Sequence, residues 1–367
     1  RFAFRINSSL FRLNAIMDVR AAKMNKDEFY PDELQYRERF VSWLPSLQFT
    51  LVRHGRRINI LNYSTSASLP SVEQLRDRID NSNPLLLQSG NPALKQSIGH
   101  RLTLSYPGNV NVDSGRNFTI SATASLNPNQ ITQRSYYFDE ATYLEKWDYT
   151  APKGSTLYTY ENISGNFSLS GDLSFSQRIA PIRSTFRAAL RYAYNQRSTF
   201  IQEEKNISRQ QQPTLSLSLG GTQSKNLRLS VHSSTSYSEV DNSIGTNTRY
   251  LYQTASAMAE VRFAKVMQLY LTYNLAHCHY LTDTGTDTTT QMLNALVGCM
   301  LAKGRVLVGV AAYDLLNRGS NFTTTTYADY EMQRWQPSFG RYFTFNVGIR
   351  LNKASQREFG AGSGRRR

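Results

Sequence analysis

The feature of this sequence that most constrains its fold is a two-residue alternation of apolar and polar side chains. In residues 214–219, Leu215, Leu217 and Leu219 alternate with threonine or serine. Successive side chains of a β-strand point to opposite faces of a sheet, so each such stretch predicts a strand with one apolar and one polar face. The pattern recurs at residues 102–106, 118–126, 167–175, 186–194, 267–275 and 343–351. Helical spacing of apolar residues is nearly absent, and only residues 71–80 suit a short helical turn.

Short and long connections alternate between these strands. Short turns are predicted near residues 7–9, 53–56, 107–115, 180–183, 224–226, 264–265 and 302–304, and long polar connections at 23–39, 64–96, 133–155, 201–212, 240–249, 281–288 and 317–337. We count about fifteen strands, many of about ten residues or more, where strands of globular proteins usually have about 5–6. Long strands with short turns at one end and long loops at the other are typical of transmembrane β-barrels. The predicted fold class is therefore all-β, an antiparallel transmembrane β-barrel portion.

The composition agrees with this fold and excludes others. The mean hydropathy is −0.47, and no apolar run approaches the roughly 18 residues of a transmembrane helix. Barrel strands are half polar, so averaging hides their membrane signal. Aromatic residues make up 12% of the chain, which argues against disorder. A soluble β-sandwich is the alternative, with shorter strands and more closely spaced turns.

Three parts of the sequence resemble the TonB-dependent-receptor-like outer-membrane β-barrel family of Gram-negative bacteria. They are residues 44–51 with 62–75, residues 83–95 (NPLLLQSGNPALK), and residues 313–317 with 340–350. The second is similar to an "NP…GNP-x-LK" segment on the receptors' extracellular side, and the third to the last two barrel strands. The resemblance implies the C-terminal part of a 22-stranded barrel whose lumen is filled by a plug. It also implies a location in the cell outer membrane, ligand capture by the outer loops and energised transport.

The resemblance also predicts domains and partners. Residues 1–352 are expected to form a partial outer-membrane β-barrel domain that lacks its N-terminal strands and plug, and residues 353–367 a basic periplasmic tail. The chain opens on Arg1 without a signal-peptide pattern, so we expect it to be a piece of a longer protein. Expected partners are outer-membrane lipid and lipopolysaccharide, the TonB energy transducer through the missing N-terminal region, a surface lipoprotein and an unknown ligand. A non-energised structural or passive barrel is the main alternative, followed by an outer-membrane hydrolase.

The net charge of +15 invites a nucleic-acid partner, but the pattern of the charges argues against one. The basic residues are spread along the strands, and no zinc-finger, RNP or helix-turn-helix signature is present. We instead expect arginine and lysine to line the lumen and loops. There they would face plug carboxylates, lipopolysaccharide phosphates or an anionic ligand, or simply form a solvated polar face.

The long connections 64–96 and 317–337 are the segments expected to face a ligand, because binding residues concentrate on long loops. In the second, Tyr327, Tyr330 and Trp335 are the candidate ligand-facing residues. Their rings would stack on a sugar or peptide, or alternatively pack the loop onto itself. No cofactor is expected. The sequence contains no G-x-S-x-G, H-E-x-x-H or glycine-rich phosphate loop, so we predict that the protein is not an enzyme.

His277 and His279 are the only candidates for a metal site. Two residues apart in a strand, they share a face, and Asp283 and Asp287 follow them. Imidazole and carboxylate suit zinc and related metals, but two histidines do not specify a site. The alternative is a pair of amphipathic rings at the rim of the barrel.

Cys278 and Cys299 are predicted to be free thiols. A hairpin symmetric about residue 285 would place Cys278 opposite residue 292, about seven residues from Cys299. At about 3.4 Å per residue this separation far exceeds the roughly 7 Å that a disulfide spans.

Overall fold

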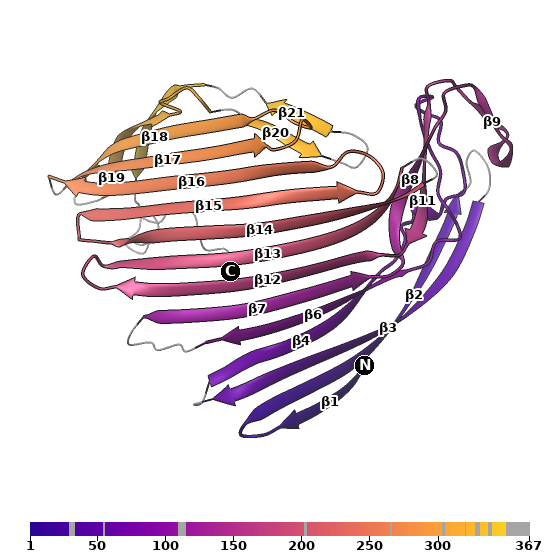
Figure 1. Cartoon of the computed structure of the whole chain (residues 1–367), viewed down its shortest axis with the longest axis horizontal. Helices are drawn as coiled ribbons and strands as arrows, with labels where there is room; N and C mark the ends of the chain where they lie inside the picture. The colour runs from indigo at the N-terminus through magenta and orange to yellow at the C-terminus, as the bar shows by residue number, and fades with distance from the viewer. Residues whose placement is uncertain are drawn as a thin grey trace.

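A computed structural model describes residues 1–28, 34–53, 56–108, 115–201, 204–264, 266–302, 305–319, 321–326, 331–336 and 340–349. Its main body is a curved antiparallel sheet of fifteen strands (Figure 1). In spatial order they are β1 (Phe2–Asn7), β2 (Phe11–Glu28), β3 (Leu34–Arg53), β4 (Arg56–Ser68), β6 (Ser97–Pro107), β7 (Arg116–Asn127), β12 (Asn166–Ile179), β13 (Ser184–Ile201), β14 (Glu204–Thr222), β15 (Leu227–Asn242), β16 (Thr248–Phe263), β17 (Met267–Tyr280), β18 (Thr288–Leu301), β19 (Val306–Tyr313) and β22 (Tyr342–Ile349). The prediction of an all-β fold with about fifteen long strands is confirmed.

The register of the strands gathers the apolar side chains on one face, here called the apolar face. Leu173 of β12 lies opposite Leu190 of β13, which lies opposite Leu215 of β14. Leu190 and Leu215 are 51% and 49% exposed. The intervening positions form the polar face, where the hydroxyl groups of Ser216 and Ser234 hydrogen-bond at 2.9 Å. An exposed apolar face on long antiparallel strands is the surface that a barrel turns toward lipid.

The two ends of the sheet differ. At one, the turn end, short connections join the strands, including residues 180–183 between β12 and β13. At the other, the loop end, residues 69–96 join β4 to β6 and residues 128–165 join β7 to β12. This alternation is the one predicted from the sequence.

Two of the predicted long loops consist of strand in the residues that the structure describes. β2 and β3 pair as far as Glu28 opposite Leu34, so residues 23–28 and 34–39 belong to the ladder. β13 and β14 likewise pair as far as Ile201 opposite Glu204. The prediction of loops at 23–39 and 201–212 is therefore wrong. Toward the loop end the side chains of these strands become polar. The backbone hydrogen bonds between the strands do not depend on apolar side chains, so the pairing continues.

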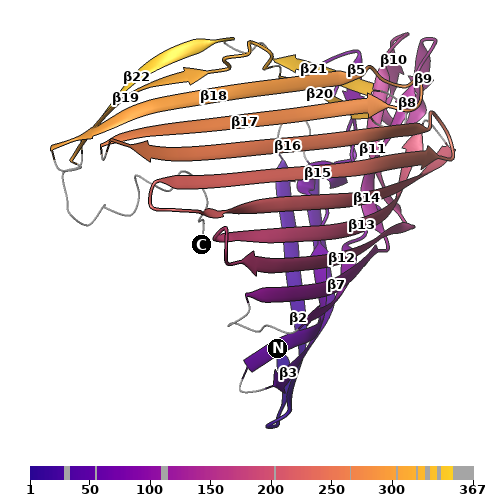
Figure 2. The same cartoon turned by 60° about the vertical axis from the view of Figure 1, so that its left-hand side comes forward.

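Shorter elements lie in the long connections. They are α1 (Val72–Leu75), β5 (Leu86–Gln88), β8 (Gln130–Tyr137), β9 (Thr142–Leu144), the 3₁₀ turn η1 (Glu145–Trp147), β10 (Tyr149–Ala151), β11 (Thr156–Ile163), β20 (Asn321–Thr326) and β21 (Glu331–Gln336). Figure 2 shows β5 and β8 to β11 gathered at the loop end. α1 lies inside the predicted 71–80 segment. Among the described residues, no helix is long and apolar enough to span a bilayer.

The two cysteines are free and lie far apart. Cys278 lies opposite Thr288, and Cys299 lies opposite Met267. The predicted register, with Cys278 opposite residue 292, is wrong by four residues because β17 continues to Tyr280 and β18 starts at Thr288. The correct register separates the thiols further than predicted.

Candidate functional site

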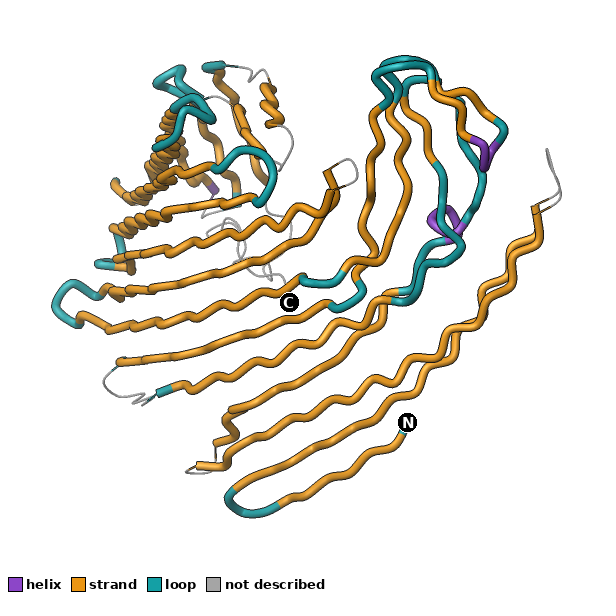
Figure 3. The backbone as a smooth tube through the Cα atoms, turned by 45° about the vertical axis from the view of Figure 1, so that its right-hand side comes forward, coloured by secondary structure: helices purple, strands orange, loops and turns teal. Residues whose placement is uncertain are grey.

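Two of the long connections at the loop end, residues 69–96 and 128–165, fold together into one unit. Parallel pairing of β5 with β11 and antiparallel pairing of β8 with β11 give a three-stranded sheet built from both connections. α1 begins at Ser71, whose side chain accepts a hydrogen bond from the Gln74 amide while the Gln74 side chain accepts one from the Ser71 amide. This reciprocal capping box stabilises a helix that is too short to persist alone. In Figure 3 the unit, with its two short helices, stands beside the far halves of β2 and β3.

Two apolar clusters hold this loop unit in place. In the first, Phe40 of β3 packs with Leu75 and Leu94 of the loop 69–96. In the second, Leu87, Ala151 and Leu157 are almost completely buried among surrounding aromatic rings. The first cluster fixes the unit to the barrel strands, and the second forms its interior.

Asparagine side chains cross-link the two connections. Asn91 Nδ2 donates to the carbonyl oxygen of Tyr160 at 2.9 Å. The Lys95 amide donates to Asn162 Oδ1 at 2.7 Å, and Asn162 Nδ2 donates to the carbonyl oxygens of Lys95 and Asn129. Asn91 belongs to the segment that resembles the receptors' "GNP" motif. In the structure Asn91 lies at the seam, the line along which the connections 69–96 and 128–165 meet.

A cavity of about 440 Å³ opens in this unit. Aromatic and apolar side chains supply part of its wall and polar groups the rest; the lining residues are Gly90, Asn91, Tyr136, Phe138, Leu144, Lys146, Trp147, Leu157, Thr159, Tyr160 and Glu161. Its volume lies in the usual range of small-molecule sites, about 300–1,000 Å³, and so does its mixture of aromatic walls with a few polar groups.

The charged groups of the cavity are held by neighbours. Lys146 Nζ lies 2.7 Å from Asp77 Oδ1 and 4.8 Å from the centroid of the Trp147 ring. The Trp147 indole N–H donates to the same Asp77 oxygen at 3.3 Å. Ammonium over an indole face is a favourable cation–π contact. Asp77 therefore positions both an ammonium and a flat aromatic ring at the wall.

A second ion pair lies within the loop unit and also contacts the barrel. Arg134 donates to Glu161 at 2.8 Å, and the guanidinium lies 4.8 Å and 4.7 Å from the ring centroids of Tyr136 and Phe200. Phe200 belongs to the far end of β13. Arginine suits this position because its planar guanidinium pairs and stacks at the same time.

The loop unit lies outside the membrane-spanning part, and two of its side chains have shifted pKa values. Hydrogen bonds from Ser82, first from its backbone amide and then from its side chain, lower the pKa of Asp80. The hydrogen bond from Tyr143 to Asp148, 2.7 Å long, raises the pKa of the Tyr143 hydroxyl. Both groups brace local turns and neither lines the cavity.

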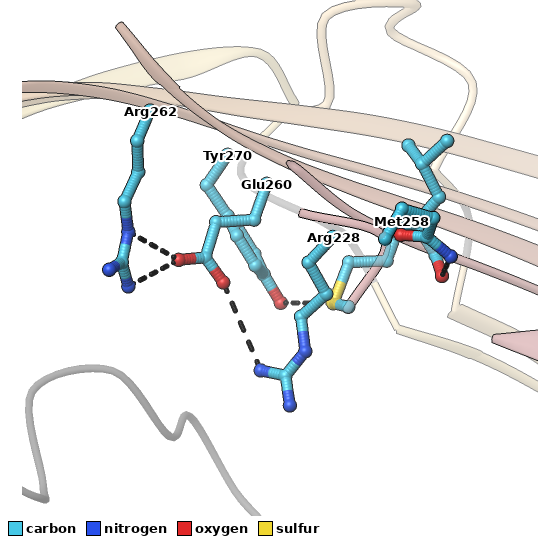
Figure 4. A network of polar contacts seen from close by, with 7 residues as sticks. Arg228, Met258, Glu260, Arg262 and Tyr270 are labelled. Atoms are coloured by element: carbon cyan, nitrogen blue, oxygen red, sulfur yellow. Dashed lines mark hydrogen bonds and ion pairs between the residues drawn. The ribbon is translucent and has the colours of Figure 1, made fainter. Parts of the chain in front are cut away.

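The polar face of the main sheet is rich in arginine. Arg1, Arg5, Arg12, Arg20, Arg101, Arg178, Arg187, Arg191, Arg197, Arg228 and Arg262 occupy its positions, against the carboxylates Asp18, Glu38, Asp172, Glu204 and Glu260. At the turn end, Glu260 accepts from Arg262 at 2.8 Å and lies 3.9 Å from Arg228 (Figure 4). The expectation that basic residues line the polar side is thus met in the described strands.

Of the residues predicted to face a ligand, Tyr327 and Tyr330 lie outside the described residues. Trp335 lies in β21, opposite Phe322 of β20. The loop 64–96 does contribute to the cavity, through Gly90 and Asn91. Sequence reasoning did not identify Trp147, Tyr136 or Tyr160 as residues of a candidate site. The signal for them was the density of aromatic residues within a connection, at 136–138 and 143–149.

His277 and His279 lie on the apolar face of β17 near the loop end. His279 Nδ1 hydrogen-bonds Asp287 Oδ2 at 2.6 Å, and His277 Nδ1 hydrogen-bonds Thr289 Oγ1 at 2.8 Å. The His279 hydrogen bond, with the Tyr280 amide as the second cause, lowers the pKa of Asp287. No cluster of three or more potential metal ligands occurs in the described part of the chain. Both imidazole rings are therefore hydrogen-bonded to neighbouring polar side chains at the loop end of the sheet.

Residues 20–198 match the model of the outer membrane protein beta-barrel family. The search of curated proteins found no match. Two solved structures, outer-membrane expressed OmpT of Vibrio cholerae and in-vitro folded OmpT of the same organism, are each 10% identical with a TM-score of 0.33, over 94% of this chain and 98% of the other. None of this ties the chain to TonB-dependent receptors in particular, and the predicted lack of enzymatic activity stays a prediction. The family match, the fifteen-stranded sheet and its exposed apolar face identify an outer-membrane β-barrel protein.

Proposed function

We propose that this chain is the barrel portion of an energised outer-membrane transporter of the TonB-dependent type. It would capture its ligand in the cavity of the loop unit and pass it along the polar face. The observation that carries the proposal is that cavity, because two connections distant in sequence are cross-linked to build it. Binding residues are concentrated on loops that a rigid scaffold positions.

The lining suggests the class of ligand. Flat apolar surfaces come from the rings of Trp147, Tyr136 and Tyr160. Hydrogen-bond donors and acceptors come from Asn91, Lys146 and Glu161. We propose a small polar molecule with an apolar side, a sugar or a short peptide. In this orientation the loop end faces outward and the turn end faces the periplasm.

The arginine-rich polar face supports a role in transport rather than a purely structural one. A lumen wall with more guanidinium groups than carboxylates attracts anionic groups and guides them. Those groups would be carboxylates of a plug or of the ligand. In a 22-stranded barrel the lumen is plugged, so passage would need energy from the inner membrane.

The test is uptake of a panel of labelled oligosaccharides and oligopeptides by cells that carry the gene, with and without the TonB energy transducer. We expect uptake of at least one member, lost without the transducer and reduced at least tenfold by Trp147→Ala. Tyr143→Ala is the matched control, since Tyr143 is an exposed ring of the same unit outside the cavity. Uptake that persists without the transducer would indicate a passive barrel, and uptake of no panel member would remove the ligand class.

A further inference from the structure

The far halves of β2 and β3 form a two-stranded ribbon at the loop end. β2 and β3 pair with each other as far as Glu28 opposite Leu34, whereas β4 pairs with β3 only from Leu47. The far half of β3 therefore has β2 as its neighbour within the main sheet. One face of this ribbon, with Phe40, packs against the loop unit. The other face continues the apolar face of the barrel and stays open.

That open face changes abruptly from apolar to cationic. Val19 lies opposite Trp43 and Ala21 opposite Val41; Trp43 and Val41 are 60% and 51% exposed. The next pair on the same face is Lys23 opposite Arg39. Residues two positions apart on one face of a strand are spaced by about 6.8 Å. Lys23 and Arg39 therefore lie one such spacing beyond Ala21 and Val41, toward the loop end. That is the height at which lipid headgroups meet a barrel, and tryptophan favours the same interface.

The cations of this face oppose one another. Lys23 and Arg39 lie directly across the two strands, and Arg37 follows on the same face opposite Asn25. All three side chains are exposed, and no described carboxylate pairs with any of them. Like charges directly opposite each other destabilise a strand pair. Among the side chains that the structure describes, no carboxylate compensates this repulsion, and an external anion can do so.

Two arginines elsewhere on the same face at the loop end lie opposite acidic residues. On β15 and β16, Arg249 lies opposite Glu239 and the two side chains pair at 2.8 Å. On β14, Arg209 lies opposite Asp241 of β15. Arg209 and Arg249 therefore each have an acidic residue across the strand, whereas Lys23 lies opposite Arg39.

We propose that Lys23, Arg37 and Arg39 form a binding site for the phosphate groups of a phosphorylated glycolipid, the lipid A portion of lipopolysaccharide in the outer leaflet. Arginine and lysine bind phosphate through charge-assisted hydrogen bonds. The acyl chains would lie against Val41 and Trp43 below. Packing of Phe40 on the opposite face holds the ribbon so that the cations point outward. The site rests on the proposed orientation, with the loop end facing outward.

The experiment measures binding of diphosphoryl lipid A and of its dephosphorylated form to the whole protein, purified in detergent and stripped of lipid. The variant is Arg37→Gln with Arg39→Gln, and the matched control is Arg209→Gln with Arg249→Gln, which removes the same charge from the same face. We expect diphosphoryl lipid A to bind the variant at least tenfold more weakly and the control within twofold of the wild type. The dephosphorylated lipid should bind all three weakly.

A second readout separates binding from folding. Without lipid A the variant should melt no lower than the wild type, because a repulsive pair has been removed, and with lipid A it should gain less stability. Arg37→Lys with Arg39→Lys keeps the charges and should retain binding, and Arg39→Gln alone provides the comparison if the double variant does not assemble. Equal binding by variant and wild type, equal loss in the control, or equal binding of dephosphorylated lipid would each overturn the proposal. Uptake is measured separately, so failure here leaves the transport proposal standing.

Discussion

Asn91 and Tyr160 lie 69 positions apart in the chain, and the Asn91 side-chain amide donates a 2.9 Å hydrogen bond to the Tyr160 carbonyl oxygen. Both residues also line the cavity of the loop unit. One contact therefore closes the seam between two long connections and shapes the candidate ligand site. Changes at this contact should affect stability and binding together.

Asn91→Ala should lower the free energy of unfolding by about 1–3 kcal/mol, because it leaves a partly buried carbonyl oxygen without its donor. Limited proteolysis of the folded protein should then cut within residues 128–165 faster than in the wild type. Asn274→Ala, on the polar face of β17, is the control and should leave these cuts unchanged. Equal protection of the loop unit in both variants would show that the seam does not depend on Asn91.

The strand pattern could be predicted from the sequence because each strand has two different environments. Leu215, Leu217 and Leu219 need the apolar side and their serine and threonine neighbours the polar side, so the two-residue period appears directly in the residues. The ends of the strands could not be predicted in this way. Beyond the apolar belt both faces of β2 and β3 are largely polar, and a polar strand has the same composition as a loop.

The candidate cavity could be predicted only in part. The loop 64–96 was identified from its length, but the partner connection at 128–165 supplies most of the wall. Trp147 reaches the cavity because β9, η1 and β10 fold back over β11, and its place depends on pairing between distant segments. Periodicity reports local environment and carries no information on which two loops meet.

Gly90→Ala should destabilise the loop unit, whereas Gly171→Ala should not. A Cβ atom at Gly90 would lie 2.5 Å from the backbone nitrogen and oxygen of Arg76 and 2.7 Å from the carbonyl oxygen of Gln74. Backbone atoms cannot rotate away, so the unit would have to shift, at a cost of about 1–3 kcal/mol for overpacking. A Cβ atom at Gly171 meets nothing within 4 Å. Urea unfolding of both variants in lipid vesicles measures the difference, and equal midpoints would contradict it.

The turn between β17 and β18 should loosen in acid. Asp287 accepts from the Tyr280 amide at 2.8 Å and shares a hydrogen bond with His279, which lowers its folded pKa below the reference value of 3.8. A depressed carboxyl pKa stabilises the fold above the unfolded pKa, and this contribution is lost as the pH falls through the folded pKa. Protection of the Tyr280 amide from hydrogen exchange should therefore be full above about pH 4 and decline below it.

Asp287→Asn should remove this pH dependence and weaken protection of the Tyr280 amide at neutral pH. Asp283→Asn, in the same turn, serves as the control and should retain the wild-type profile. A Tyr280 amide that exchanges at the same relative rate from pH 2 to pH 6 in the wild-type protein would rule out the role given to Asp287.

Arg134 and Glu161 should be energetically coupled. Their side chains are 17% and 34% exposed and pair at 2.8 Å, while the guanidinium also stacks between Tyr136 and Phe200. A partly buried, hydrogen-bonded pair of this kind should give a coupling energy of about 1–3 kcal/mol in a double-mutant cycle, above the roughly 0–1 kcal/mol of exposed pairs. The cycle combines Arg134→Met and Glu161→Gln, with stability measured by urea unfolding in vesicles.

The exposed pair Arg191 and Asp172, 3.6 Å apart on the polar face with side-chain exposures of 59% and 46%, provides the comparison for that cycle. Its coupling should stay below about 1 kcal/mol, because water screens both charges. Arg134→Lys should also cost stability, since an ammonium cannot stack between two rings as a planar guanidinium does. If both pairs gave the same small coupling, the Arg134–Glu161 pair would stabilise the loop unit no more than an exposed pair does.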